Sequence, residues 1–202
     1  MKSKMKLKLS AILMVAVITS LSFLAFTPKA DTYNVDLTKS SISWEAKKLT
    51  GGHTGFIDLT SGNLVFNGKK LAGGNFAANM ASLRTMDNNK PNAGLDKHLK
   101  ADDFFGVDKF PAASFVIKKV VGGGNNVTVT GDLTMKGITN SITFPATLTW
   151  NADKTISANA DKIEIDRTKF GIQYRSKSIF SDIGDKMIED NFTIAVKLVV
   201  KK

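Results

Sequence analysis

The sequence predicts an all-β domain in which antiparallel strands form a sandwich or a barrel. Apolar and polar residues alternate over long runs, as in ITFPATLTW (142–150), and this period of two is typical of strands with one buried face. Short segments rich in glycine and asparagine, such as 67–68 and 122–126, separate the runs and are typical of hairpin turns. Only one segment has the spacing of a helix.

The first thirty residues differ from the rest of the chain and are interpreted as a signal peptide. Four lysines between positions 2 and 8 precede an apolar run from Leu9 to Phe26, and a small residue, Ala30, offers a cleavage point. The run is long enough for an uncleaved membrane anchor, which remains the alternative. We therefore expect a signal peptide over 1–30, a single domain over 31–202, and a periplasmic or secreted protein.

The strands are expected where the alternation is clearest. We predict about eight of them, near residues 33–48, 53–59, 62–66, 75–86, 112–121, 126–135, 141–150 and 155–167, with a last one near 191–201. Leu95 and Leu99 lie four residues apart, as do Asp96 and Lys100, so one short helix is predicted near residues 92–100. Closing the sheet into a barrel would remove exposed strand edges.

Composition excludes several classes of function. Without residues 1–30 the formal charge falls from +10 to +5, which suits a soluble domain better than a nucleic-acid-binding one. The chain has no cysteine and two distant histidines, so we expect no metal site and no cofactor. Neither a nucleophile elbow nor a phosphate-binding loop occurs in the sequence. Nothing in the sequence therefore predicts an enzyme.

Five blocks in order resemble the YceI-like family of bacterial periplasmic or secreted proteins. They read GGHTGFIDLTSGNL (51–64), LDKHLKADDFFGVDKFPAASF (95–115), GDLTMKGITNSITFP (131–145), IDRTKFGIQYRS (165–176) and GDKMIEDNF (184–192). The resemblance covers essentially all of residues 32–200. It implies an eight-stranded antiparallel barrel of lipocalin-like fold, a long apolar lumen that holds a polyisoprenoid or fatty-acyl lipid, and no enzymatic activity.

The inward positions of the strands give the candidate site residues. For the apolar lumen we predict Trp44, Phe56, Phe66, Phe76, Met80, Phe115, Val129, Phe144, Leu148, Ile165, Phe192 and Ile194. A polar mouth that contacts the lipid head group is predicted at His53, His98, Arg167 and Tyr174. For Arg167 a structural ion pair with a nearby acid is the alternative.

Three functions remain open at this stage. The first is non-catalytic binding or transport of a long apolar lipid, with transient contact with a membrane surface and no nucleic-acid partner. The second is an enzyme that acts on a lipid in the same barrel. The third is a filled barrel that serves as a scaffold, because stripes of inward apolar residues also describe a packed core. Frequent inward alanines, such as Ala78 and Ala146, favour a hollow interior over a filled one.

Overall fold

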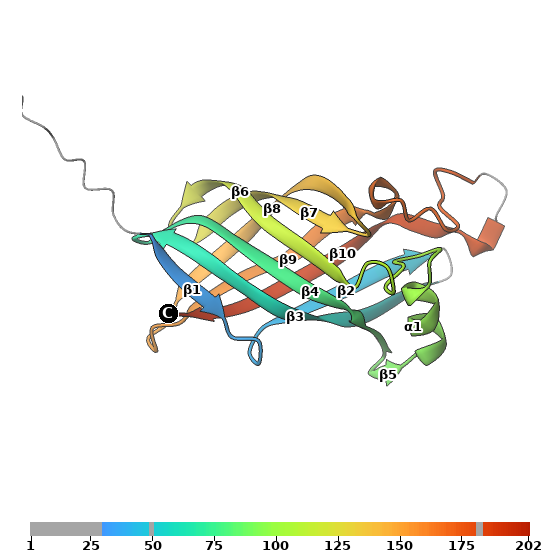
Figure 1. Ribbon diagram of the computed structural model, residues 1–202, viewed down its shortest axis with the longest axis horizontal. Helices are drawn as coiled ribbons and strands as arrows, with labels where there is room; N and C mark the ends of the chain where they lie inside the picture. The colour runs from blue at the N-terminus through green and yellow to red at the C-terminus, as the bar shows by residue number, and fades with distance from the viewer. Residues whose placement is uncertain (1–29, 49–50, 181–183) are drawn as a thin grey trace, which may run out of the picture.

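Eight antiparallel strands close into a barrel in the computed structural model, which describes residues 30–48, 51–180 and 184–202 (Figure 1). The predicted signal peptide lies outside these residues except for Ala30. Each barrel strand pairs with its neighbours, and pairing between the strands at Gly51–Asn67 and Lys70–Asp87 closes the ring. The barrel strands are β2 (Ser41–Lys48), β3 (Gly51–Asn67), β4 (Lys70–Asp87), β6 (Ala112–Gly123), β7 (Asn126–Met135), β8 (Ile138–Trp150), β9 (Ile156–Asp166) and β10 (Ile188–Lys201). The predicted eight-stranded barrel is confirmed.

The remaining elements lie outside the ring of eight. They are β1 (Asp31–Val35), β5 (Lys90–Pro91), the helix α1 (Ala93–Lys100), and the 3-10 turns η1 (Arg167–Phe170) and η2 (Gly184–Lys186). The single predicted helix is α1, and it begins after Asn92, whose side chain accepts a hydrogen bond from the Leu95 N–H. In the described part of the chain, no helix has the length and hydropathy to cross a membrane.

Three of the predicted strand ranges differ from the strands of the structure. The range 33–48 is interrupted between β1 and β2, where Asp36 accepts hydrogen bonds from the backbone N–H and the hydroxyl of Thr38 and forms a turn. Both pieces still fill the space between β3 and β10. Conversely, 53–59 and 62–66 belong to one strand, β3, whose pairing with β4 shifts register between Leu59 and Ser61. The shift breaks the alternation without ending the strand.

The hairpin between β7 and β8 shows how turn chemistry sets the faces of the strands. Lys136 and Gly137 both have positive φ, 51° and 75°, as a two-residue type I′ turn requires. This turn fixes the register, with Val129 opposite Phe144. Ile142, Phe144, Ala146 and Leu148 consequently face the inside, whereas Thr143 and Thr147 are exposed.

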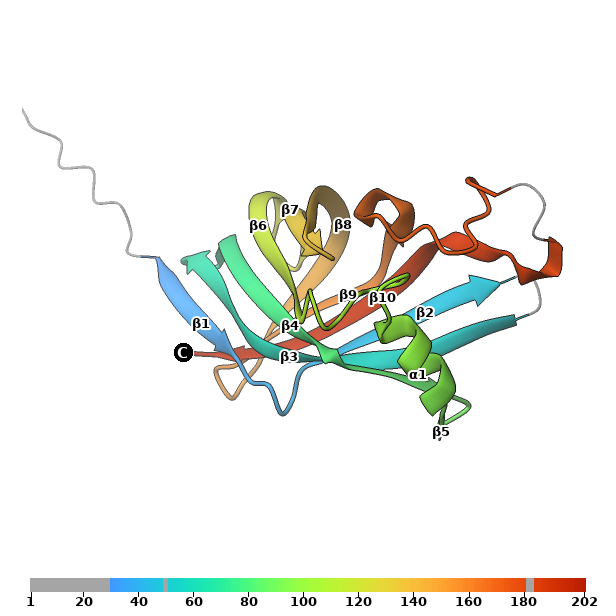
Figure 2. The same ribbon diagram turned by 45° about the vertical axis from the view of Figure 1, so that its right-hand side comes forward.

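The two ends of the barrel are different. At the end near the C-terminus, Phe66 is fully buried between Tyr33 and Trp150, with ring centroids 5.5 and 5.3 Å away, and these rings close the barrel. Figure 2 shows α1 lying at the opposite end, together with the segment that joins β9 to β10. Asp96 fastens α1 to the barrel by accepting a hydrogen bond of 2.6 Å from the Thr85 N–H. Among the described residues, this second end carries the candidate entrance.

Candidate functional site: an apolar lumen and its vestibule

An apolar cavity of about 160 Å³ lies inside the barrel and is bordered by side chains of all eight barrel strands. Ser114 and Asn159 are its only polar lining residues in the described part of the chain. A cavity of this character stays dry and takes up apolar molecules, because water would find almost no hydrogen-bond partners in it. We call this cavity the lumen.

The lumen is hollow rather than filled by side chains. Inward-facing Phe76, Phe115, Phe144, Phe192 and Ile194 are only partly buried, although they lie in the middle of strands. In a packed core such residues would lose nearly all of their exposed surface. Alanines contribute to the free space at the inward positions Ala78, Ala113, Ala146, Ala158 and Ala160. The interior therefore has room for a slender guest.

Nine of the twelve residues predicted for the lumen border it. They are Phe76, Met80, Phe115, Val129, Phe144, Leu148, Ile165, Phe192 and Ile194. Their contact with a ligand stays a prediction.

The three other predicted lumen residues lie elsewhere. Phe56 lies on the outer surface, 38% exposed, with the Arg84 guanidinium 5.6 Å from its ring centre, so this prediction was wrong. The inward residue at this level is Gly55, which has no side chain that the alternation could reveal. Phe66 belongs to the closed end of the barrel, and Trp44 borders a second cavity instead.

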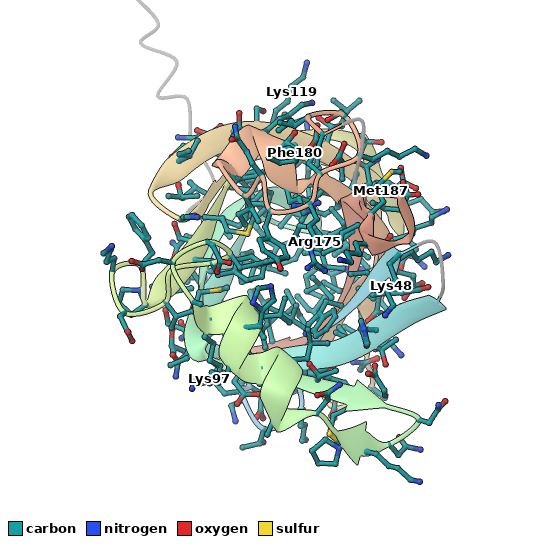
Figure 3. All side chains as sticks on the ribbon, turned by 90° about the vertical axis from the view of Figure 1, so that its right-hand side faces the viewer. Lys48, Lys97, Lys119, Arg175, Phe180 and Met187 are labelled. Atoms are coloured by element: carbon teal, nitrogen blue, oxygen red, sulfur yellow. The ribbon has the colours of Figure 1, made fainter. Side chains whose placement is uncertain are left out.

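The second cavity, here called the vestibule, lies at the α1 end of the barrel and has a volume of about 380 Å³. Figure 3 looks onto this end and shows Lys48 and Arg175 beside its central opening. Trp44 borders the vestibule, whereas its partner on β10, Ile194, borders the lumen. The vestibule is lined by Trp44, Ala46, Lys47, Lys48, His53, Leu95, His98, Leu99, Phe104, Tyr174, Arg175, Lys186 and Ile188.

His53 enters the vestibule from β3 and is hydrogen-bonded to Asp87. Its Nδ1 lies 2.6 Å from an oxygen of Asp87, and the Thr54 N–H donates to the same carboxylate at 3.0 Å. Burial, the largest single influence, acts to raise the pKa of Asp87, but hydrogen bonds from His53 and Thr54 outweigh it and lower the pKa. The carboxylate of Asp87, at the rim of the vestibule, is thus already bound by groups of the protein itself.

His98 and Tyr174 come from distant parts of the chain and meet at the mouth. Their ring centroids are 4.6 Å apart, and Phe104 lies 5.8 Å from the His98 ring. All three side chains line the vestibule. Within the described residues, no group of three histidines, aspartates or glutamates is close enough together to hold a metal ion. The predicted mouth residues His53, His98 and Tyr174 are thus brought together around one cavity.

Arg167 does not take part in the mouth. It is 3% exposed, and its guanidinium donates to the carbonyl oxygens of Ile172, Ile188 and Glu189 at 2.9 to 3.2 Å. Asp190 lies 3.7 Å away. Burial lowers the pKa of Arg167, against the opposing effect of the Asp190 and Asp166 charges. Its prediction as a ligand contact was wrong: the side chain ties the segment after β9 to the start of β10, which is the structural alternative.

Sequence reasoning missed the cations of the vestibule. Lys47 and Lys48 end β2, and Arg175 follows Tyr174 in a turn. Isolated lysines and arginines are common on every surface, so neither their type nor their spacing distinguishes them. Only the closure of the barrel brings the end of β2 next to the segment between η1 and β10.

Comparisons with known proteins agree with this architecture. The model of the YceI-like domain matches residues 33–200. Protein YceI of Escherichia coli is 31% identical over 110 residues, which cover 54% of this chain and 56% of that protein. The chain thus spans about half the length of the curated relatives it matches.

Solved structures extend the likeness to most of the chain. BcnA of Burkholderia cenocepacia is similar with a TM-score of 0.67 and 25% identity, covering 82% of this chain and 98% of that one. A polyisoprenoid-binding domain from Saccharophagus degradans has a TM-score of 0.64 at 13% identity, over 84% of this chain and 97% of that one, and shares the fold. The match over residues 33–200, on a closed eight-stranded barrel, shows that the chain belongs to the YceI-like family.

Proposed function

We propose that this protein binds a long apolar lipid, of polyisoprenoid or fatty-acyl type, in its lumen. One observation carries the proposal: inward aromatic and aliphatic side chains of the barrel are left partly buried around a cavity that is almost entirely hydrocarbon. A guest chain would complete their burial. The description of the S. degradans domain as polyisoprenoid-binding supports the same class of ligand.

The energetics favour a long unbranched or prenyl tail over a compact ligand. Each methylene that leaves water for an apolar site contributes about 0.8 kcal/mol. A tail that runs from the vestibule past Phe192 and Phe144 towards Leu148 would bury many such groups without any polar contact. Affinity would then depend on tail length, and the head group would remain near the entrance.

The proposed role is binding or transport rather than catalysis. Asp103, which could pair with His98 in an enzyme, is exposed and does not line the vestibule. The His53–Asp87 pair lies at the rim, and Asp87 is held by the Thr54 backbone. We place this role in the periplasm or outside the cell, with transient contact at a membrane surface when lipid enters or leaves.

Mass spectrometry of an organic extract tests the proposal directly. The mature protein is purified from the envelope fraction without added detergent, extracted, and compared with an equal amount of an unrelated exported protein. A single class of long-chain lipid near one molecule per protein is expected. Failure to find any enriched lipid, combined with failure to bind added prenyl or acyl chains, would rule out the proposal and favour a scaffold. Chemical conversion of the added lipid would favour an enzyme.

A further inference from the structure

The vestibule has a pronounced excess of positive charge. Lys47, Lys48, Arg175 and Lys186 line it, and no acidic residue of the described chain does. Of the nearby acids whose partners are described, Asp87 lies against His53, Asp190 accepts hydrogen bonds from Ser176 and Ser178, and Glu189 pairs with Lys177. Glu45 pairs with Lys47, one of the four cations. Lys48 and Arg175 therefore face the vestibule without a described carboxylate partner.

Arg175 is held in place by its backbone and its neighbours. It has a positive φ of 47°, a left-handed conformation that non-glycine residues rarely adopt. Its carbonyl oxygen accepts a hydrogen bond of 3.0 Å from the Ile188 N–H, and its guanidinium lies 5.1 Å from the centre of the Tyr174 ring. The hydrogen bond and the contact with the Tyr174 ring hold the side chain in a particular place. Here that place is the lining of the vestibule (Figure 3).

We propose that the vestibule selects lipids with an anionic head group, a carboxylate or a phosphate, bound by Lys48 and Arg175. This inference rests on the proposed lipid-binding function and adds the class of head group to it. Oxygen anions fit because they accept several hydrogen bonds at once and are attracted by both cations. A neutral alcohol or amide would gain only the apolar burial of its tail.

Matched ligands that differ only in charge test this inference. The mature protein, stripped of bound lipid on a hydrophobic resin, is titrated at pH 7.5 with geranylgeranyl phosphate and geranylgeraniol. A separate titration uses palmitate and the alcohol of the same chain length, hexadecanol. We expect at least tenfold tighter binding of the anion in one or both pairs, and a preference that declines as salt is added. The two pairs distinguish a phosphate from a carboxylate as the preferred head.

Variants assign the effect to residues. The double change Lys48→Gln and Arg175→Gln is expected to abolish most of the anion preference while the alcohols bind as before. A double change of the exposed outer lysines, Lys119→Gln and Lys197→Gln, removes the same charge and should change neither.

The outcomes separate the two proposals. Equal binding of anion and alcohol by the unchanged protein would overturn the head-group inference and leave lipid binding intact. An anion preference that survives the Lys48 and Arg175 changes would overturn the assignment to the vestibule. Failure to bind any of the four ligands would instead count against the proposed function itself.

Discussion

The indole of Trp44 lies directly over Gly55 of the adjacent strand: a Cβ placed on Gly55 would be 2.6 Å from two of the ring carbons. The two residues are paired in the register of β2 and β3, and Thr85 of β4 is the next residue in the same row. The absence of a side chain at Gly55 leaves the space that the ring occupies.

Gly55→Ala is accordingly expected to displace Trp44 and to destabilise the domain. Overpacking of this kind costs about 1–3 kcal/mol, and here backbone and ring both oppose the methyl group. Thermal unfolding followed by near-ultraviolet circular dichroism would report both effects. Gly73→Ala in β4 is the matched control, because a Cβ there meets nothing within 4 Å and the φ is not positive. Equal stability of the two variants would contradict the packing argument.

The two faces of β8 make a sharp test of the lumen. Phe144→Asp would place a carboxylate among hydrocarbon side chains, where it costs several kcal/mol or stays protonated. Thr147→Asp, three residues on, points into solvent. We expect the first change to unfold the domain or to abolish lipid retention, and the second to leave both nearly intact. Melting temperature and extractable lipid are measured for each. The reverse pattern would invert the assignment of the faces.

Asp190 links the start of β10 to the segment that carries Arg175. Its oxygens accept hydrogen bonds from the Ser176 hydroxyl at 2.5 Å and the Ser178 N–H at 3.2 Å, and Arg167 lies 3.7 Å away. Burial acts most strongly and raises the pKa of Asp190, but these hydrogen bonds and the Arg167 charge together lower it. Asp190→Asn is expected to reduce the free energy of unfolding by about 3 kcal/mol at pH 7, because buried Arg167 loses its counter-charge.

The lowered pKa of Asp190 predicts that the stability of the domain depends on pH. A carboxyl group whose pKa is lower in the folded protein stabilises the fold above its unfolded pKa of about 3.9, and this contribution is lost as the pH falls below that value. The stability difference between the unchanged protein and Asp190→Asn should therefore be constant from pH 7 to about 5 and should shrink towards pH 3. Asp161→Asn, at an exposed position of β9, is the control and should leave stability at pH 7 unchanged. A difference that grows on acidification would contradict the argument.

The start of the first strand bears on where the predicted signal peptide would be cleaved. The first strand, β1, begins at Asp31, and Asp31 pairs with Phe66 of β3. Cleavage after Ala30 would thus release the folded domain without removing a strand residue. N-terminal sequencing of the protein from the envelope fraction is expected to begin at or near Asp31. A membrane-bound product that starts at Met1 would favour the anchor instead.

The barrel was predictable from sequence because its strands have one apolar face, and alternation reveals such strands directly. The inward stripe of β8 from Ile142 to Leu148 is an example. The alternation failed where a small residue took the inward position. Gly55 left Phe56 as the apparent apolar residue, although its ring is on the outer surface. The bulge near Leu59 similarly divided one strand into two, because a register shift changes which residues face inward.

The vestibule could be predicted only in part. His53, His98 and Tyr174 could be predicted as mouth residues because their side chains are chemically distinctive. Lys48 and Arg175 could not be predicted, since they become neighbours of one cavity only when the barrel closes. Arg167 was predicted as a ligand contact because of its charge, but its guanidinium donates hydrogen bonds to three backbone carbonyls instead. Local sequence cannot show which carbonyls a distant segment will leave unpaired.

A substitution that fills the lumen should reduce lipid binding without unfolding the domain. Ala146 lies on the inner face of β8 and borders the lumen, whereas the adjacent Thr147 lies outside. Ala146→Phe adds a ring that occupies the path of the proposed tail, and its burial offsets part of the strain of insertion. We expect the co-purified lipid to fall at least fivefold, while the lipid-free protein keeps its melting temperature within a few degrees. Thr147→Phe adds the same ring to the outer surface and should retain the lipid. If Ala146→Phe folds and still carries a full complement of lipid, the tail does not pass this level of the barrel, and the partly buried aromatic residues of the lumen require another explanation.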